Sequence, residues 1–422
     1  MTFQEQNQFL TQRRWRVLAA CCITNLCLGA PYAWSVFAGP LAEHLNALHG
    51  TAMTASDLAL AFSFSSSLTF ITMIAGGYLE KKIGARRIIF AGVILFGIGF
   101  LVCGMARSVL AVIFGFGVIG GLANGLGYVC TVSTAVKFFP DKKGLIGGIS
   151  TASYGISSVI IPPIADALNR SVGISRAFTI FGIAIIGIGG LCSLFILNCP
   201  DDYTPTGWNG GSSDAAGTSR DMTALQMLAS PIFYVMLAMM FIGATIGLMM
   251  ISETAAIAQT MLGMSSSAAA LIVSTYALFN TGSRIVVGWI SDKIGRIRTI
   301  TYVLVLMVLS LVAIYLSGLN GNTFLFRAGI CLIGFSYGSF MGIYPAFTSD
   351  QFGVKYSALN YGILFIGFSL AGVVGPLIMQ KIFSEFGSYR PSFPIAIVFA
   401  LIGIALTFLY RAVNRKLAQK SA

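Results

Sequence analysis

The sequence predicts an all-α membrane protein with twelve transmembrane helices, arranged as two pseudo-symmetric six-helix halves. Three observations lead to this fold class. Of the 422 residues, 56% are hydrophobic and 9% are charged, with a mean hydropathy of +0.84, whereas soluble proteins carry about 25% charged residues. Apolar stretches long enough to cross a bilayer recur along the chain. A short glycine-containing pattern also occurs twice, half a chain apart.

Twelve apolar stretches are long enough to cross the hydrocarbon core as helices, which takes about 20 residues. They lie at 15–38, 56–79, 88–106, 109–137, 144–168, 174–198, 231–253, 265–290, 299–318, 324–349, 356–383 and 391–413. Several are longer than the minimum, as tilted helices are. Membrane lipid is therefore an expected partner of the outer surface.

Lysine and arginine side chains near the ends of the spans predict the orientation of the chain. When alternate loops are grouped with both termini, nineteen of the 26 cations fall on one side and six on the other, while Arg284 lies within a span. Because cytoplasmic loops are enriched in Lys and Arg, both termini are expected in the cytoplasm. This placement explains the formal net charge of +12 without a nucleic-acid partner.

The longest polar stretch divides the twelve spans into two groups of six. It is rich in Gly, Ser, Thr and Asp, a composition typical of a flexible linker. The expected organisation is a cytoplasmic tail at 1–14, an N-terminal six-helix half at 15–198, a cytoplasmic linker at 199–230, a C-terminal six-helix half at 231–413 and a cytoplasmic tail at 414–422.

The two halves share sequence patterns, which indicates an internal repeat. Gly77-Tyr-Leu-Glu-Lys-Lys-Ile-Gly84 follows the second span, and Gly288-Trp-Ile-Ser-Asp-Lys-Ile-Gly295 follows the eighth, at an offset of 211 residues. A second pair of segments, 141–155 and 354–362, begins the fifth and eleventh spans. Two matching six-span halves are typical of transporters built from repeats.

One arginine, Arg284, interrupts the eighth apolar stretch. Asp292 marks the water edge eight residues later, so Arg284 is expected about 12 Å inside that edge. An arginine at this depth costs at least about 2.5 kcal/mol unless it meets a partner or a cavity. A guanidinium can hold a carboxylate through two hydrogen bonds. Asn280 lies one turn earlier, where its amide can orient the guanidinium or reach a ligand.

Two interpretations of Arg284 stay open at this level. The side chain either binds an anionic substrate or is a structural arginine paired with backbone carbonyl groups. No Asp or Glu lies at a comparable depth in the other spans, so a permanent salt bridge has no obvious partner. This absence favours substrate binding.

The loop patterns resemble the major facilitator superfamily, in which Gly-x-x-x-Asp-(Arg/Lys)-x-Gly-Arg recurs after the second and eighth spans. The second copy matches in full, with Gly288, Asp292, Lys293, Gly295 and Arg296. The first copy keeps Gly77 and Gly84, but Lys81 stands where the aspartate belongs and Glu80 comes one residue early. The resemblance implies a gating role for these loops and a contact with a neighbouring helix that the first copy is not expected to make in the same way.

Within that superfamily the chain resembles the oxalate/formate antiporter family, which also includes pyruvate and other monocarboxylate carriers. The resemblance covers nearly the whole chain. Its most specific pieces are Phe139-Pro-Asp-Lys-Lys-Gly144, Leu278-Phe-Asn-x-Gly-x-Arg284, Ser349-Asp-x-Phe-Gly-x-x-Tyr-Ser-Ala-x-Asn-Tyr-Gly362 and Tyr32-Ala-Trp-Ser35.

The resemblance implies further substrate-binding residues at positions that line the family's central cavity. They are Tyr32, Tyr128, Tyr337, Met341, Phe365 and Phe368. Oxalate-type members carry a second cation, a lysine, at the position of Phe368. One buried cation matches one carboxylate, because a second carboxylate would be uncompensated in a medium of low dielectric constant. A monocarboxylate such as pyruvate, lactate or formate is therefore favoured over oxalate.

The energy source is less constrained by the sequence. No Gly-x-x-x-x-Gly-Lys-Ser/Thr pattern or metal-ligand spacing is present, so an enzyme, a cofactor and a metal site are not expected. Glu253 and Asp166, near the outer ends of their spans, are the nearest carboxyl groups for proton coupling. More distantly similar animal monocarboxylate carriers have an aspartate where this chain has Asn280. Proton symport, anion exchange and facilitated transport stay open.

The sequence thus predicts a secondary transporter of small organic anions in the cytoplasmic (inner) membrane, working by alternating access around Arg284. Its partners would be a small carboxylate and, for coupled transport, a proton or a counter-anion. An oxalate/formate-type dicarboxylate exchanger is the alternative within the same class. A membrane anion sensor and a channel are the alternatives from a different class. A sensor usually carries a larger soluble output domain than the linker at 199–230.

Overall fold

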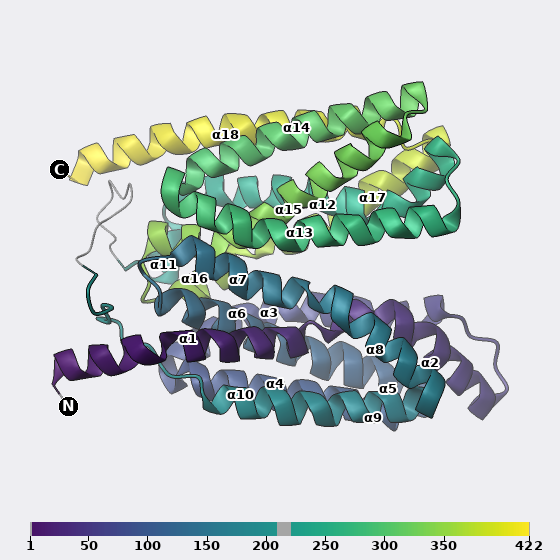
Figure 1. Cartoon of the computed structure of the whole chain (residues 1–422), viewed down its shortest axis with the longest axis horizontal. Coiled ribbons are helices and arrows are strands. Elements are labelled where there is room, and N and C mark those ends of the chain that lie inside the picture. The colour runs from purple at the N-terminus through teal and green to yellow at the C-terminus, as the bar shows by residue number, and fades with distance from the viewer. Residues whose placement is uncertain (1, 209–220, 422) are drawn as a thin grey trace. The chain divides into compact units, whose positions relative to one another are not determined.

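The computed structural model describes residues 2–208 and 221–421, and every regular element within these ranges is helical (Figure 1). Within these two ranges, twelve helices, or runs of joined helices, are long and apolar enough to cross a membrane. Each of them corresponds to one of the twelve predicted stretches. The predicted fold class is therefore confirmed, while residues 209–220 of the predicted linker lie outside the described residues.

The helical elements include short 3₁₀ and π segments, labelled η. In chain order they are α1 (Phe3–Leu28), η1 (Ala30–Ala33), α2 (Trp34–His49), η2 (Ala55–Leu58), α3 (Ala59–Ile83), α4 (Ala85–Gly104), α5 (Val109–Val112), η3 (Ile113–Gly120), α6 (Gly121–Lys137), α7 (Lys143–Gly155), α8 (Ser157–Val172), α9 (Ile174–Ala184), η4 (Ile185–Gly189), α10 (Gly190–Leu194), α11 (Ala224–Leu228), α12 (Pro231–Leu262), α13 (Ser266–Ile294), α14 (Arg296–Asn320), α15 (Thr323–Phe352), α16 (Ser357–Leu364), α17 (Ile366–Phe386) and α18 (Ser392–Ser421).

Several helices extend beyond the apolar stretches that predict them, because a helix ends at its cap and not at the edge of the hydrocarbon core. α1 begins inside the predicted N-terminal tail with a capping box: Thr2 N donates to Glu5 Oε2 at 2.8 Å, and Glu5 N donates to Thr2 Oγ1 at 3.3 Å. The first span continues through η1 and α2 to His49, past the predicted end at residue 38.

The two copies of the loop pattern form the same turn. Gly84 ends α3 with φ 87° and ψ 148°, and Gly295 ends α13 with φ 89° and ψ 148°. Glycine adopts such positive φ values without the steric cost that other residues meet. The sequence repeat is therefore also a repeat of backbone conformation.

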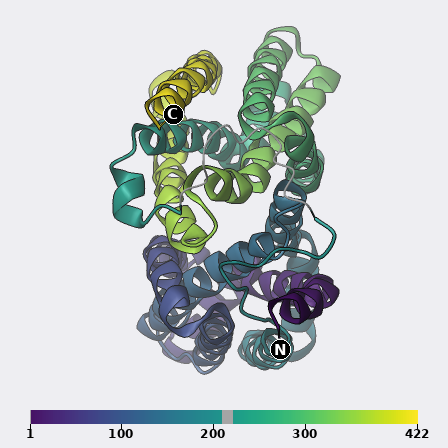
Figure 2. The same cartoon turned by 90° about the vertical axis from the view of Figure 1, so that its left-hand side faces the viewer.

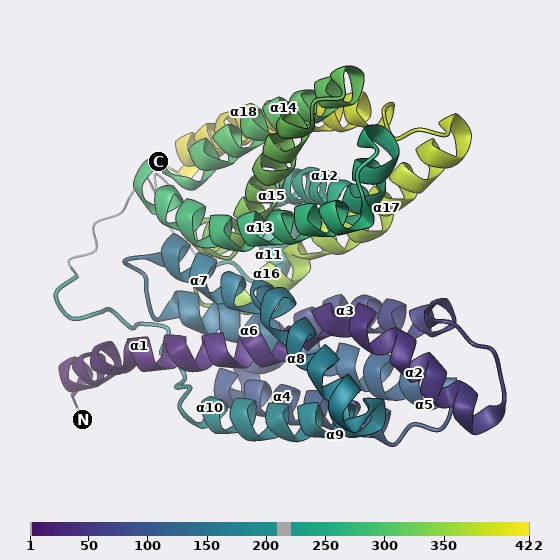
Figure 3. The same ribbon diagram turned by 45° about the vertical axis from the view of Figure 1, so that its right-hand side comes forward.

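The helices pack into two compact units. Of the described residues, unit 1 comprises 2–141, 153–208 and 354–363, and unit 2 comprises 142–152, 221–353 and 364–421. Within unit 1, α3 and α4 lie against α6; within unit 2, α13 and α14 lie against α15, and α12 lies against α17 (Figure 3). Figure 2 looks along most of these helices. The first part of α7 thus packs among the C-terminal helices.

A row of glycines on α15 brings its backbone close to α13. Gly334, Gly338 and Gly342 are spaced four residues apart, so they share one face of the helix. A Cβ atom added to any of them would lie 3.0 Å or less from a backbone oxygen of α13, at Tyr276, Asn280 and Arg284 respectively. Small residues at such an interface let membrane helices approach closely. The backbone of α13 at Asn280 and Arg284 is therefore held against α15.

Unit 1 contains the counterpart of this contact. Three glycines on η3 and α6 face α3: Gly117, Gly121 and Gly125. A Cβ atom added to any of them would lie 3.0 Å or less from a backbone oxygen of α3, at Ala61, Ser65 and Thr69 respectively. The offset of 211 residues relates Ser65 to Tyr276 and Thr69 to Asn280. The same offset relates Arg284 to Met73, which is fully buried. The two repeats therefore share their packing, while the arginine occurs in one of them alone.

Substituting Gly338 by alanine is expected to destabilise the protein by about 1–3 kcal/mol, because the new methyl group would overlap a backbone oxygen that cannot rotate away. The measurement is the midpoint of thermal unfolding in detergent. Gly282 on α13 provides the matched control, since a Cβ atom there would meet nothing within 4 Å. Equal midpoints for Gly338→Ala and Gly282→Ala would contradict the described contact.

Candidate functional site

Arg284 is buried in the middle of α13, with 5% of its surface exposed. Its Nη1 donates a hydrogen bond to the backbone oxygen of Thr151 on α7 at 2.8 Å. Its Nη2 donates to Oδ1 of Asn280 at 2.9 Å. The predicted proximity of Asn280 is thus present as a hydrogen bond, and the carbonyl of Thr151 is a partner that the sequence does not identify.

Two donors at this place have no partner among the residues that the structure describes. The Nε of Arg284 and the Nδ2 of Asn280 are buried and make no hydrogen bond. Within residues 2–208 and 221–421, the recorded partners of the guanidinium are neutral, and none of the ion pairs includes it. A buried charge without a counter-charge and a buried donor without an acceptor are both costly. The arrangement can therefore accept an anion that brings both a negative charge and hydrogen-bond acceptors.

Glycines on two helices position the backbone of Arg284. Gly148 on α7 and Gly342 on α15 each approach its carbonyl group so closely that an added Cβ atom would lie within 3.0 Å of the oxygen. Because Gly148 is three residues before Thr151, this close approach brings the carbonyl of Thr151 within reach of the guanidinium. In unit 1, Gly362 approaches the backbone oxygen of Met73 in the same way.

Three of the predicted aromatic residues form one cluster in unit 2. The rings of Tyr337 and Phe368 are stacked, with centroids 6.5 Å apart and planes at 8°. Phe365 lies 4.6 Å from Phe368 between centroids. Tyr337 is 6% exposed and Met341, one turn later on α15, is 3% exposed. A Cβ atom on Gly247 of α12 would overlap the Tyr337 ring, so this glycine makes room for the tyrosine.

The remaining predicted aromatic residues, Tyr32 and Tyr128, lie in unit 1 and meet at Tyr154. Tyr128 is 6% exposed and Tyr32 is 47% exposed. Both rings contact Tyr154 edge to face, at centroid distances of 5.5 Å for Tyr32 and 4.8 Å for Tyr128. Asn124 Nδ2 lies 3.2 Å from the Tyr154 hydroxyl and donates to the backbone oxygen of Leu28 at 2.8 Å.

Tyr154 is a residue that the sequence reasoning missed. Gly148 and Gly362 hold equivalent places against Arg284 and Met73. Tyr154 stands six residues after Gly148, and Phe368 stands six residues after Gly362. Tyr154 is therefore the counterpart of Phe368, a relation that the sequence shows once the glycine contacts set the register between the repeats.

The second copy of the loop pattern forms a charged network within unit 2. Asp292 accepts hydrogen bonds from the backbone nitrogens of Gly144 and Leu145, both at 2.8 Å, and so caps the N-terminus of α7. Asp292 also pairs with Arg296 at 2.7 Å. Asp350 joins Arg296 at 2.9 Å and Lys143 at 2.8 Å. The network thus ties α7 to α13 and α15.

Two other residues of this loop pattern have separate contacts. The Nζ of Lys293 lies 3.8 Å from the centroid of the Trp289 ring, a cation–π contact on the same helix. A Cβ atom on Gly288 would lie within 3.0 Å of the backbone oxygen of Gly144, so Gly288 permits the close crossing of α13 and α7.

The first copy of the loop pattern makes different ion pairs within unit 1. Lys81, at the place of the aspartate, pairs with Asp201 at 2.8 Å. Glu80 pairs with Lys137 at 2.6 Å, and both of these side chains are 8% exposed. Gly77 retains its packing role, because an added Cβ atom would overlap the backbone of Ala358 and Leu359.

Substituting Asp292 by alanine is expected to destabilise the start of α7 by about 1–2 kcal/mol, because two backbone donors lose their acceptor and Arg296 loses a partner. Hydrogen exchange of the amides in residues 143–148 should then become faster. The control is Asp202→Ala, which removes an exposed aspartate. If exchange in residues 143–148 were the same in both variants, the capping role would be refuted.

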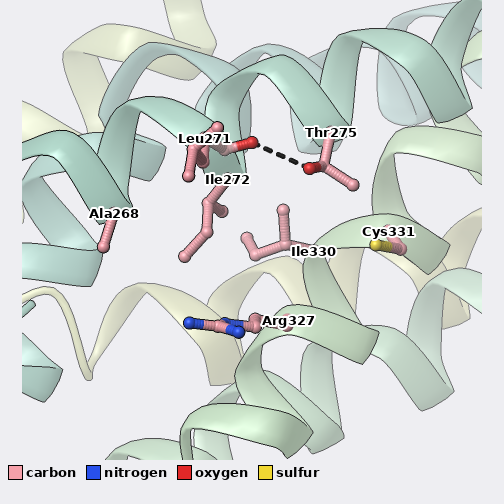
Figure 4. A pocket seen from close by; sticks show the side chains of 7 residues that line it. All are labelled: Ala268, Leu271, Ile272, Thr275, Arg327, Ile330 and Cys331. Atoms are coloured by element: carbon pink, nitrogen blue, oxygen red, sulfur yellow. Dashed lines mark hydrogen bonds between the residues drawn. The ribbon is translucent and has the colours of Figure 1, made fainter.

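A separate cavity of about 180 Å³ lies between α13 and α15 (Figure 4). Its lining consists of Ala268, Leu271, Ile272, Thr275, Arg327, Ile330 and Cys331. Thr275 donates its hydroxyl hydrogen to the backbone oxygen of Leu271 at 2.8 Å, as the dashed line in Figure 4 shows. Thr275 precedes Arg284 by nine residues, about 13 Å along the helix, and none of the predicted site residues lines this cavity.

Comparison with known proteins places the chain among transporters. The profile described as Major Facilitator Superfamily matches residues 19–376. The chain is 32% identical to the uncharacterized MFS-type transporter YhjX of Escherichia coli, over 85% of this chain and 86% of the relative. It is 28% identical to the oxalate:formate antiporter of Oxalobacter formigenes, over 97% and 94%. The human organic anion transporter MFSD10 has the same fold, with a TM-score of 0.71 and 13% identity over 93% of this chain and 99% of that structure.

Proposed function

The chain belongs to the major facilitator superfamily and is a multi-pass membrane transporter, and from this premise we propose that it carries a small monocarboxylate across the cytoplasmic (inner) membrane. Transport proceeds by alternating access around Arg284. Pyruvate, lactate and formate are the substrate candidates, since each is small and has one carboxylate.

The observation that carries this proposal is the buried guanidinium beside a buried amide, each with one donor atom that has no partner in the described part of the chain. Arg284 Nε and Asn280 Nδ2 are both buried and unpaired. A carboxylate offers acceptors for both donors and neutralises the charge, which makes its hydrogen bonds stronger than those of a neutral ligand. A carboxylate therefore supplies both the counter-charge and the hydrogen-bond acceptors that this arrangement lacks among the described residues.

The preference for one carboxylate rests on the number of buried cations. Among the described residues, Arg284 and Lys137 are the cations buried below 10% exposure, and Lys137 is already paired with Glu80. Phe368, at the position where the resemblance to the oxalate/formate antiporter family implies a lysine in oxalate-type members, is an apolar ring in contact with Tyr337 and Phe365. A carboxylate placed against these rings would lose its hydration without a compensating charge. A monocarboxylate has no second charge that would have to be buried there.

Anion binding can be linked to movement through the partners of Arg284. Nη1 donates a hydrogen bond to the carbonyl of Thr151 on α7. A bound carboxylate competes for the same guanidinium, which weakens the attachment of α7 to α13. The glycine contacts between Gly144 and Gly288 then have to open for α7 to move away. Binding energy is thus spent on a change between conformations, as alternating access requires.

For the coupling we propose anion exchange. The empty carrier leaves the charge of Arg284 uncompensated in the closed state, so closure is easier with an anion bound. The carboxyl groups considered for proton coupling have other partners: Glu253 accepts from Tyr389 at 3.0 Å, and Asp166 pairs with Arg170 at 3.0 Å. Tyr389, outside the spans, has its pKa raised to about 12 by burial and by Glu253, so it keeps its proton near neutral pH.

The test is counterflow in proteoliposomes with radiolabelled pyruvate, lactate, formate and oxalate, at two pH values on either side of neutrality. Saturable, trans-stimulated exchange of the monocarboxylates, with little dependence on pH, is the expected result. Uptake driven by a pH gradient alone would indicate proton symport instead of anion exchange. A clear preference for oxalate would favour the dicarboxylate exchanger, and non-saturating currents would favour a channel.

A further inference from the structure

The loop pattern at the end of α3 has Lys81 where the family pattern has an aspartate. A carboxylate from another part of the chain, that of Asp201, lies beside this lysine. We propose that Asp201, in the segment after the sixth span, is a positioning residue that replaces the missing loop aspartate and holds α16 against α3. The link from this contact to transport rests on the proposed function, whereas the contact itself does not.

The C-terminal repeat shows what the loop aspartate does. Gly288 packs against the backbone of Gly144, and Asp292, one turn later, accepts hydrogen bonds from Gly144 N and Leu145 N at 2.8 Å each. The carboxylate therefore lies at the N-terminus of α7, where unpaired amides and the helix dipole both favour a negative charge.

The N-terminal repeat preserves the packing but reverses the charge. Gly77, the counterpart of Gly288, packs against Ala358 and Leu359 at the start of α16. Lys81, the counterpart of Asp292, cannot accept a hydrogen bond from these amides. A cation near a helix N-terminus is also unfavourable. A second cation, Lys355, precedes α16 by two residues, so the contact gathers two positive charges.

Asp201 lies between these two cations. Both of its carboxylate oxygens accept hydrogen bonds from Lys81 Nζ at 2.8 Å. Lys355 Nζ lies 3.7 Å from one of the oxygens. The Lys81 ammonium also lies 5.4 Å from the centroid of the Tyr356 ring, directly before α16. Asp201 thus neutralises the charge that would otherwise drive α16 away from α3.

The segment that carries Asp201 is held in place on unit 1. Asn198 Oδ1 accepts from Arg86 N at 3.3 Å, in the first turn of α4. Thr11 on α1 accepts from Thr206 N at 3.2 Å, and its hydroxyl lies 3.1 Å from that of Tyr203. These contacts on both sides of Asp201 lower the entropy cost of placing its carboxylate between the lysines.

The first experiment measures backbone hydrogen exchange of the purified full-length protein in nanodiscs without substrate. In Asp201→Asn, peptides that cover residues 354–364 are expected to exchange two- to five-fold faster, an effect of the size that partly exposed ion pairs have. Residues 143–148, capped by Asp292, keep their exchange rates. Asp202→Asn is the matched control because it removes a neighbouring exposed charge. Unchanged exchange in Asp201→Asn, or equal acceleration in both variants, overturns the proposal.

The second variant tests replacement directly. Lys81→Asp restores a carboxylate at the counterpart of Asp292, so the double variant Lys81→Asp, Asp201→Asn is expected to exchange as slowly as the unmodified protein in residues 354–364. A double variant that is folded but still exchanges as fast as Asp201→Asn overturns the assignment. Because this readout needs no substrate, it separates failure of the positioning role from failure of the transport proposal. In counterflow, Asp201→Asn should change the KM two- to five-fold and leave the order of substrates unchanged.

Discussion

Replacing Arg284 by methionine is expected to lower the rate of monocarboxylate counterflow by about 100-fold or more, while the protein still folds. Loss of one partner of a buried, hydrogen-bonded charge pair costs about 2–5 kcal/mol, and each 1.4 kcal/mol is a factor of ten. Methionine suits this position because the counterpart residue in the N-terminal repeat is Met73. The measurement is the initial rate of counterflow, with the thermal midpoint as the check on folding.

Two comparisons sharpen this prediction. Arg284→Lys keeps the charge but loses the planar fork, so it should retain part of the activity with a raised KM. Arg327→Gln removes an exposed arginine at the separate cavity and should leave counterflow unchanged. Since the described partners of the Arg284 guanidinium are neutral, Arg284→Met without substrate should be at least as stable as the unmodified protein. Normal transport by Arg284→Met would refute the substrate-binding role.

Replacing Phe368 by lysine is expected to raise the preference for oxalate over a monocarboxylate by about ten-fold or more. Phe368 is partly buried against Tyr337 and Phe365, and an ammonium there would supply the second cation that a dicarboxylate needs. A stabilisation of about 1.4 kcal/mol is enough for a ten-fold change. The ratio of counterflow rates for oxalate and pyruvate gives the result directly.

Phe368→Leu is the control for this substitution, because it removes the ring stacking without adding charge. It should change the rates for both substrates in parallel and leave their ratio near that of the unmodified protein. If Phe368→Lys also left the ratio unchanged in a folded protein, the argument that this position sets the number of carboxylates would be wrong.

The fold could be predicted from the sequence because the features that indicate it, the apolar spans and the glycine turns, each lie within a short stretch of the chain. Each span needs about 20 apolar residues, and the repeated turns at Gly84 and Gly295 need glycine. The hydrogen bond between Asn280 and Arg284 was also predictable, since residues four apart on a helix are neighbours. Helix ends were less predictable, because the cap at Thr2 and Glu5 lies in the polar tail and not in the apolar stretch.

The contacts that the sequence did not predict join residues that are far apart along the chain. Thr151 contributes its backbone oxygen to Arg284, and a carbonyl group leaves no signature in the residue type. Lys81 and Asp201 are 120 residues apart, so their pairing depends on how the segment after α10 folds back. Tyr154 carries a detectable signal, yet that signal emerges only after the glycine contacts establish the register between the repeats.

The most direct test of the central claim is equilibrium binding of a radiolabelled monocarboxylate to the purified protein. One anion should bind to each chain of the unmodified protein and of Arg327→Gln, and binding to Arg284→Met should fall below detection. Binding of equal affinity and stoichiometry by Arg284→Met and the unmodified protein would contradict the account.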